Sequence, residues 1–364
     1  MRQQARGRTA LGAFLLALAL ALGITIGGGA AAVFLWSPAA QAQRAIDQPA
    51  NAVGRGNASD EWRLVRKGIQ GEVSIPNQQA GVLIQSDGQT FRSLHNGPLS
   101  AAGAYLLLAV IAVLALFFML RGRIRIEKGR SGRLIARFTS LERVMHWLTA
   151  SSFVLLALSG LNMLYGRYVL RPIVGPTAFA ELTRLGKYCH NYLAFAFMIG
   201  IVLMFILWAR DNIPDRYDLK WFAKGGGMVM KGVHPPARKF NGGEKVLFWL
   251  TILGGVSVSF SGIALLFPFH FFWFSNTFGV LNLFGAGLPT DLTPLQDTQL
   301  SELWHATVAL LLIGVVIAHI YIGTVGMEGG FDAMNDGKVD ANWAEQHHSV
   351  WVAEMEKRPA GGDD

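Results

Sequence analysis

The segment Leu303-Trp-His-Ala-Thr-Val-Ala-Leu-Leu-Leu-Ile-Gly-Val-Val-Ile-Ala-His-Ile-Tyr321 carries two histidines in a run without Lys, Arg, Asp or Glu. The apolar run continues to residue 327, which is long enough to cross a hydrocarbon core of roughly 30 Å as a helix. His305 and His319 are 14 residues apart. At about 100° per residue they return to within roughly 40° of the same helix face, about 21 Å apart in height. The segment therefore predicts a transmembrane helix with an inward histidine near each membrane surface.

Composition extends this prediction to the whole chain. Of its 364 residues, 52% are hydrophobic and only 15% are charged, which is typical of a membrane protein. Lipid offers backbone groups no hydrogen-bond partner, so helices are expected. The runs predicted to span the bilayer are 101–120, 147–165, 188–209, 246–269 and 303–327.

The positive charge and the cysteine count exclude two classes of function. The formal charge is +8, but the basic residues flank the apolar runs instead of forming one patch, so no nucleic-acid partner is expected. Cys189 is the single cysteine, which excludes an intramolecular disulfide and a cysteine-ligated iron–sulfur cluster within this chain.

The N-terminal 42 residues have the features of an export signal. Arginines precede an apolar run that ends near Trp36, and Ala40-Gln-Ala42 has the small-x-small form of a signal-peptidase site. Cleavage after Ala42 is predicted, with an uncleaved signal anchor as the alternative because the run is long. Both place residues 43–99 outside the cytoplasm. The polar, turn-rich composition of 43–99 predicts a small exported segment of turns and short strands.

Loop charges predict the orientation of the helices. Eight Lys and Arg lie within 121–143 and eight within 210–245, whereas 166–187 has four and 268–302 has none. The positive-inside rule therefore places 121–143 and 210–245 in the cytoplasm and the other two loops outside. An exported N-terminal segment requires the same arrangement.

Four histidines lie at membrane depth, where ionisable residues are costly and commonly functional: His146, His190, His305 and His319. The predicted topology sorts them into an outer pair, His190 with His305, and an inner pair, His146 with His319. Two imidazoles from facing helices at one height can supply both axial ligands of a haem iron. We therefore predict two bis-histidine haems. For any one histidine alone, a packed ring bonded to a backbone carbonyl is the alternative.

Other residues allow less specific interpretations. A zinc or copper site is disfavoured because the four histidines do not converge on one point. Gly160, on the same helix face as His146, either lets an outer haem approach the backbone or is an ordinary helix-contact residue. Cys189 is expected to be a small packed thiol. The remaining histidines are expected at surfaces, loops or the membrane interface: His95, His234, His270, His347 and His348.

At these residues the sequence resembles the cytochrome b (gamma) subunit of respiratory, membrane-bound formate dehydrogenases. The resemblance spans about 137–358 and includes the His305…His319-Ile-Tyr pair. The other segments that carry it are Arg137-Phe…Glu142-Arg-Val-Met-His146-Trp, Asp211-Asn-Ile-Pro-Asp215, Lys239-Phe-Asn-Gly-Gly-Glu-Lys245 and Gly337-Lys-Val…Trp343-Ala-Glu-Gln-His-His348.

The resemblance implies cofactors, a substrate and partners. The family's ligands for two b haems map onto the four histidines, and its quinone pocket maps onto Asn241, Gly243 and His319. Glu244 differs from the neutral polar residue of the shorter family form. The expected partners are an iron–sulfur (beta) subunit and a molybdenum- or tungsten-containing catalytic (alpha) subunit. The quinone is ubiquinone or menaquinone.

We therefore predict an all-α protein of the bacterial inner membrane. A four-helix di-haem cytochrome b bundle (137–330) follows a signal (1–42), an exported segment (43–99) and an additional transmembrane helix (100–121), and precedes a cytoplasmic tail (331–364). The expected function is electron transfer from the iron–sulfur partner through two haems to quinone, with formate oxidation elsewhere. Alternatives are the cytochrome b subunit of a nickel–iron hydrogenase or thiosulfate-type reductase, and a non-redox anchor or transporter.

Overall fold

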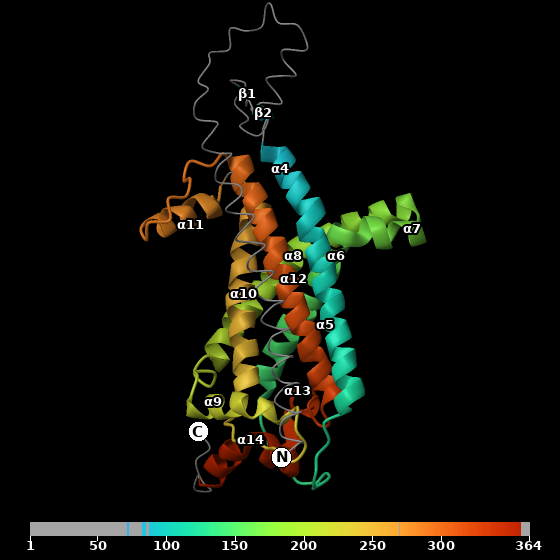
Figure 1. Cartoon of the computed structure of the whole chain (residues 1–364), viewed down its shortest axis with the longest axis vertical. Helices are drawn as coiled ribbons and strands as arrows, with labels where there is room; N and C mark the ends of the chain where they lie inside the picture. The colour runs from blue at the N-terminus through green and yellow to red at the C-terminus, as the bar shows by residue number, and fades with distance from the viewer. Residues whose placement is uncertain (1–70, 73–81, 85–86, 269, 358–364) are drawn as a thin grey trace, which may run out of the picture. The chain divides into compact units, whose positions relative to one another are not determined.

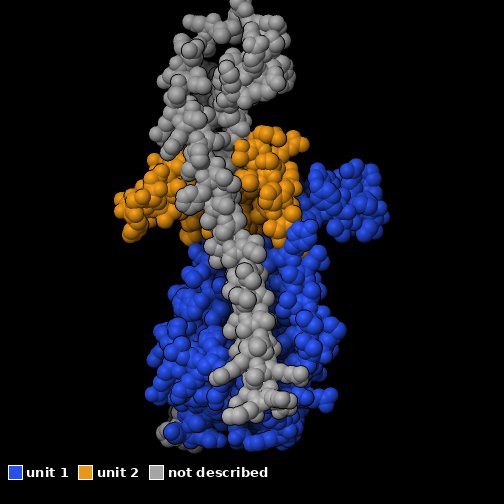
Figure 2. Space-filling view, in the orientation of Figure 1, with its two compact units in different colours: residues 1–21, 105–259, 308–364 blue, residues 22–104, 260–307 orange. Residues whose placement is uncertain are grey.

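A computed structural model describes residues 71–72, 82–84, 87–268 and 270–357 (Figure 1). The predicted signal, residues 1–42, and most of the predicted exported segment lie outside the described residues. The described residues divide into two compact units (Figure 2). Unit 1 contains 105–259 and 308–357, and unit 2 contains the described residues up to 104 together with 260–307.

Five helices in the described part of the chain have the length and composition to cross a membrane. They are Gly88–Arg121, Ser140–Val169, Pro176–Trp208, Gly242–Leu266 and Pro294–Gly326. Each coincides with one of the five predicted apolar runs, so the predicted all-helical membrane architecture is confirmed. The apolar surface agrees with this: Leu158, Ile206 and Leu253 are each at least 60% exposed. Such a surface suits contact with lipid tails.

The first span begins earlier than its apolar run. It consists of α4 (Asp87–Leu94), a π-helical turn (His95–Leu99) and α5 (Ser100–Arg121). Pro98 lies in the π-helical turn and cannot donate a backbone N–H, which disturbs the regular helical pattern. Residues 87–99 are therefore helical and not the turns and strands expected for this part of 43–99. Further upstream, β1 (Gly71–Glu72) and β2 (Val82–Ile84) form a short antiparallel pair.

In unit 1, α6 (Ser140–Val169) and α8 (Pro176–Trp208) pack against one another, joined by the short α7 (Arg171–Val174). Their approach is close, because a Cβ added at Gly200 would lie only 2.4 Å from Thr149 Oγ1. Small residues at such crossings let helix backbones come together.

Glycines of a third membrane helix contact both α8 and a fourth membrane helix. These two helices are α10 (Gly242–Leu266) and α12 (Pro294–Tyr321), which continues as a π-helical turn (Ile322–Gly326). In unit 1, a Cβ at Gly254 would lie 2.7 Å from Leu312, and a Cβ at Gly255 would lie 2.7 Å from Ile201 of α8. The helices are therefore close enough to hold side chains at defined positions between them.

Shorter elements of unit 1 gather at the ends of these helices. Strand β3 (Leu134–Ala136) pairs in antiparallel fashion with β4 (Lys338–Asp340), so the segment before α6 is tied to the C-terminal segment. The remaining elements are α9 (Arg216–Ala223), a 3-10 turn (Gly225–Gly227), α13 (Asp332–Asn335) and α14 (Ala341–Glu356). Trp343 and Trp351 of α14 belong to the buried core of unit 1 together with Phe197 and Trp208 of α8.

Unit 2 has its own apolar core. Helix α11 (Trp273–Asn282) places Phe274 and Phe278 against Leu300 and Leu303. The carboxylate of Asp297 accepts the backbone N–H groups of Phe274 and Ser275, which satisfies donors that the start of a helix leaves free.

Candidate functional site

The inner pair of histidines meets in unit 1. His146 lies in the second turn of α6 and His319 lies near the end of α12, and their ring centroids are 6.2 Å apart. Metal–nitrogen bonds of about 2 Å place two imidazole centroids on opposite sides of an iron roughly 6 Å apart. The two rings therefore fit the axial positions of one haem. The structure brings together the two histidines that the sequence paired at the inner end.

Aromatic packing surrounds the His146 ring. Trp147 and Trp208 have ring centroids 5.2 and 6.5 Å from that of His146. The Nδ1 atom of His146 is buried and has no hydrogen-bond partner among the described residues. Contacts with neighbouring rings, and not a hydrogen bond at Nδ1, orient this histidine.

The outer histidines have hydroxyl partners, each within its own unit. In unit 1, His190 of α8 has its Nδ1 atom 2.9 Å from Ser159 Oγ of α6. In unit 2, His305 of α12 has its Nδ1 atom 3.1 Å from Ser261 Oγ of α10. A hydrogen bond at Nδ1 fixes the tautomer and orientation of an imidazole whose Nε2 binds metal.

A glycine follows each of these serines and lies against the same histidine. A Cβ at Gly160 would be 3.5 Å from His190 Cε1, and a Cβ at Gly262 would be 3.3 Å from His305 Cε1. The neighbour of Gly160 is thus a side chain of α8, and the approach of an outer haem to this glycine stays a prediction. The sequence reasoning missed Ser159 and Ser261. The available signal was a Ser-Gly pair on the transmembrane helix preceding each outer histidine.

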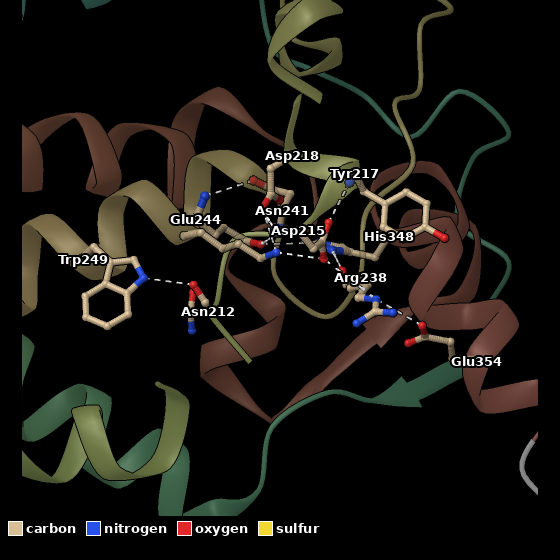
Figure 3. A network of polar contacts seen from close by, with 11 residues as sticks. Asn212, Asp215, Tyr217, Asp218, Arg238, Asn241, Glu244, Trp249, His348 and Glu354 are labelled. Carbon is tan, nitrogen blue, oxygen red and sulfur yellow. Dashed lines mark hydrogen bonds and ion pairs between the residues drawn. The ribbon is translucent and has the colours of Figure 1, made fainter. Parts of the chain in front are cut away.

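A buried polar network lies beside the start of α10 in unit 1 (Figure 3). The buried guanidinium of Arg137 donates to the Glu244 carboxylate at 2.9 Å and to the Lys239 carbonyl at 2.7 Å. Asn241 Oδ1 accepts the Glu244 N–H, while Glu244 accepts the Asn241 N–H. These reciprocal bonds form a capping box at the beginning of α10.

A second part of the network centres on Lys245. This buried ammonium donates to Asp215 and Asp218, at 3.0 Å each. Burial alone would raise the pKa of Asp215, but the bonds from Lys245 and from the Tyr217 N–H hold that pKa below its usual value. The backbone carbonyl of Asn212 accepts the indole N–H of Trp249 at 2.9 Å. Four of the segments that carry the resemblance thus converge here: 137–147, 211–215, 239–245 and 337–348.

The predicted quinone residues Asn241 and Gly243 have structural neighbours at the helix start. Asn241 forms the capping box with Glu244. A Cβ at Gly243 would lie 2.6 Å from the Trp221 ring, so the glycine is needed for that packing. Both residues shape the entry to α10 in the unit that also holds His319.

The expectations for His348 and Cys189 are wrong. His348 is fully buried and not a surface residue. Its Nδ1–H donates to the Arg238 carbonyl at 2.7 Å, and its Nε2 lies 3.9 Å from Glu244. Burial first, and then the charge of Arg137, lower the pKa of His348 to about 3. Cys189 is exposed, so the expected packed thiol is also wrong. In both cases tertiary packing decided the exposure of the side chain, which local composition did not reveal.

His95, expected to be a solvated surface residue, instead lies 3.4 Å from the Glu302 carboxylate in unit 2, with its side chain only 19% exposed. His234, expected in a solvated turn, is partly exposed and lies 2.9 Å from Glu127.

Transmembrane helices that hold two imidazole rings at a spacing suited to axial ligation of one iron define a class, the membrane-bound b-type cytochromes. Comparison with known proteins narrows this class. The chain belongs to the prokaryotic cytochrome b561 family, whose model matches residues 137–336.

Several relatives have formate dehydrogenase in their names. The cytochrome b556(Fdn) subunit of the nitrate-inducible formate dehydrogenase of Escherichia coli K12 is 25% identical over 230 residues, 63% of this chain and 94% of the relative. The cytochrome b556(fdo) subunit of the same strain is 27% identical over 224 residues, 61% and 94% of the two chains. The cytochrome b556 subunit of Haemophilus influenzae formate dehydrogenase is 26% identical over 234 residues, 63% and 87%. These relatives confirm the resemblance noted in the sequence.

Proposed function

We propose that this chain is the cytochrome b subunit of a formate dehydrogenase in the bacterial inner membrane. It takes electrons from an iron–sulfur subunit at the outer face and delivers them through two b haems to quinone on the cytoplasmic side. The observation that carries this proposal is the 6.2 Å separation of the His146 and His319 rings, in a family of b-type cytochromes. The names of the relatives support formate dehydrogenase over hydrogenase or thiosulfate reductase.

In this proposal the chain's residues bind and orient the cofactors. His146 and His319 ligate the inner haem, and His190 and His305, paired by the sequence-derived topology, ligate the outer one. Haem supplies reversible one-electron transfer. The apolar helices keep water away from the ligands, and a low dielectric strengthens each electrostatic interaction there.

The outer face would bind the iron–sulfur subunit, which in turn carries the molybdenum- or tungsten-containing subunit. The docking surface would comprise loops 166–187 and 268–302 and the exported segment 43–99. Around α7, Tyr168, Val169 and Ile173 are at least 61% exposed, and an apolar surface beyond the membrane suits a protein partner. A tag after residue 364 should be protected from external protease in intact spheroplasts. Ready cleavage there would reverse the orientation and the docking face.

Quinone would bind at the cytoplasmic end, near His319, Asn241 and Gly243. The turn at Asn241 precedes a helix start, where backbone N–H groups can point at a carbonyl oxygen of the ring. Protons for quinone reduction would enter from the cytoplasm. With electrons arriving from outside, turnover would move charge across the membrane.

The decisive experiment is a reduced-minus-oxidised visible spectrum. The purified chain should show b-type haem bands, with two haem b per chain by pyridine haemochromogen assay. In membranes containing the whole complex, formate should reduce these bands and hydrogen should not. Reduction by hydrogen would support the hydrogenase alternative, and a spectrum without haem bands would make the chain a non-redox anchor or transporter.

A further inference from the structure

Ser159 and Ser261 occupy equivalent places beside the two outer histidines. Each is buried on a transmembrane helix, each has its Oγ near the Nδ1 atom of a histidine on the following membrane helix, and each is followed by glycine. The sequence separations differ, at 31 and 44 residues. A duplicated sequence motif would place both serines at the same distance in sequence from their histidines. The separations differ, so the packing of the helices brings each serine to its histidine.

We propose that Ser159 and Ser261 are positioning residues for the outer haem. Each hydroxyl holds the Nδ1–H of its histidine, so that the Nε2 lone pair faces the iron. This inference rests on the proposed haem-binding function and adds residues that act through the ligands.

The direction of the hydrogen bond at Ser159 follows from counting protons. The Ser159 hydroxyl has one hydrogen, and it lies 2.8 and 3.0 Å from the backbone carbonyls of Leu155 and Leu156, which can only accept. The hydroxyl therefore donates to the helix backbone and accepts from His190 Nδ1–H. With the proton on Nδ1, Nε2 is left as the metal-binding atom.

The glycines complete the arrangement. Because Gly160 and Gly262 carry no side chain, each histidine lies with its Cε1 edge against the helix that carries its serine. A Cβ would make an ordinary contact with that edge at Gly160 and a tight one at Gly262, so side chains larger than alanine would push the ring from the serine. The Ser-Gly pair thus provides one hydrogen-bond acceptor and the space needed to reach it.

The arrangement also has an electronic consequence. An acceptor at Nδ1–H makes an imidazole a stronger donor to the metal, which stabilises ferric iron relative to ferrous iron and lowers the reduction potential. His146 has no such partner at Nδ1 among the described residues. This difference favours a lower potential at the outer haem and electron transfer toward the inner one.

The test compares matched serines on α6. Ser152 is buried like Ser159 and its hydroxyl bonds to the Leu148 and Thr149 carbonyls, the same backbone pattern without a histidine. Ser159→Ala and Ser261→Ala should speed transfer of the outer haem to apomyoglobin about 10- to 100-fold. They should also raise its reduction potential and shift the ligand-sensitive g values of the oxidised haem. Ser152→Ala should change none of these.

Ser159→Thr and Ser159→Val form a second pair, which differs only in the hydroxyl and guards against a general loss of folding. Thr should retain the wild-type outer-haem potential and Val should raise it. Equal potentials for Thr and Val, or equal behaviour of Ser159→Ala and Ser152→Ala, would overturn the inference. A wild-type chain without an outer haem would instead refute the proposed function, so the two failures are distinguishable.

Discussion

The inner and outer histidines are oriented by different kinds of contact. His146 lies among tryptophan rings with no hydrogen-bond partner at Nδ1 in the described chain, whereas His190 and His305 each have a serine hydroxyl at that atom. Histidines that look alike in the sequence thus have different environments. Helical spacing can therefore identify a set of candidate ligands. The orientation and tautomer of each imidazole depend instead on neighbours from other helices.

The two ends also differ in what supports the ligands. On the inner side, unit 1 has a buried ionic network around Glu244 and Lys245 (Figure 3). At the outer histidines the hydrogen bonds come from the serine hydroxyls Ser159 and Ser261. We therefore expect substitutions in the ionic network to lower stability, and substitutions of these serines to alter the cofactor.

The largest expected effect is the loss of one haem. His319→Ala and His146→Ala should each remove the inner haem, because one axial imidazole holds it poorly, and should leave the outer haem largely in place. His190→Ala and His305→Ala should do the reverse. Haem content and the bands in the reduced-minus-oxidised spectrum measure this. Loss of the opposite haem, or a content that stays at two per chain, would show that the pairs are wrong.

Arg137→Met should destabilise the chain by about 3–5 kcal/mol, because it leaves the Glu244 carboxylate without its buried partner. Thermal unfolding in detergent measures the loss. Arg184→Met is the matched control, since Arg184 pairs with Glu181 at 2.7 Å but both side chains are more than half exposed. That pair should contribute far less to stability, because water already solvates both side chains. Similar losses of stability in the two variants would show that the buried network stabilises the chain no more than an exposed ion pair does.

Stability should fall in mild acid because of His348. Its folded pKa is about 3, below the ordinary value of 6.5, so the unfolded chain binds a proton that the folded chain excludes. The stability is complete above pH 6.5 and is lost as the pH falls toward 3. Between pH 7 and 5 the loss is about 2 kcal/mol.

His348→Gln should flatten that slope. The charged and titratable groups that face His348 are Arg137, Glu244 and His347, and none of them changes in this variant. Unfolding free energies measured at several pH values give both slopes, and an unchanged slope in His348→Gln would assign the acid sensitivity to another group.

The smallest expected effect is kinetic. Asn241→Ser keeps a side-chain oxygen to cap α10, so both haems and stability to within about 1 kcal/mol should be retained. Reoxidation of the reduced haems by a quinone analogue should become slower, because the shorter side chain no longer reaches the quinone. Asn241→Leu would confound the test by removing the cap as well. Unchanged reoxidation with full sensitivity to quinone-site inhibitors would exclude Asn241 from the pocket.

Much of the fold was predictable because lipid allows few solutions. Uncharged runs of sufficient length had to be helices, and helical spacing alone placed His305 and His319 at two depths. The pairing of His146 with His319 followed from loop charges, and the centroids of these rings lie 6.2 Å apart in unit 1.

The rest depended on contacts between distant segments. Nothing local to His348 distinguishes a buried histidine from one on a polar tail, since its burial comes from α14 packing against Arg137 and Arg238. Ser159 looks like an ordinary small residue until α8 brings His190 to it. The early start of the first helix, at Asp87, was hidden by polar residues and by Pro98. In each case tertiary structure overrode the local pattern.

The buried network has a consequence for biogenesis. Arg137 precedes the first of the four histidine-bearing segments, whereas His348 is close to the C-terminus, and the two meet at Glu244. A chain made from its N-terminus therefore cannot complete this network until the ribosome has released α14. His190 and Ser159 emerge much earlier, within neighbouring helices. The order of synthesis thus allows His190 to be oriented during translation. The network at Glu244 forms only after translation is complete.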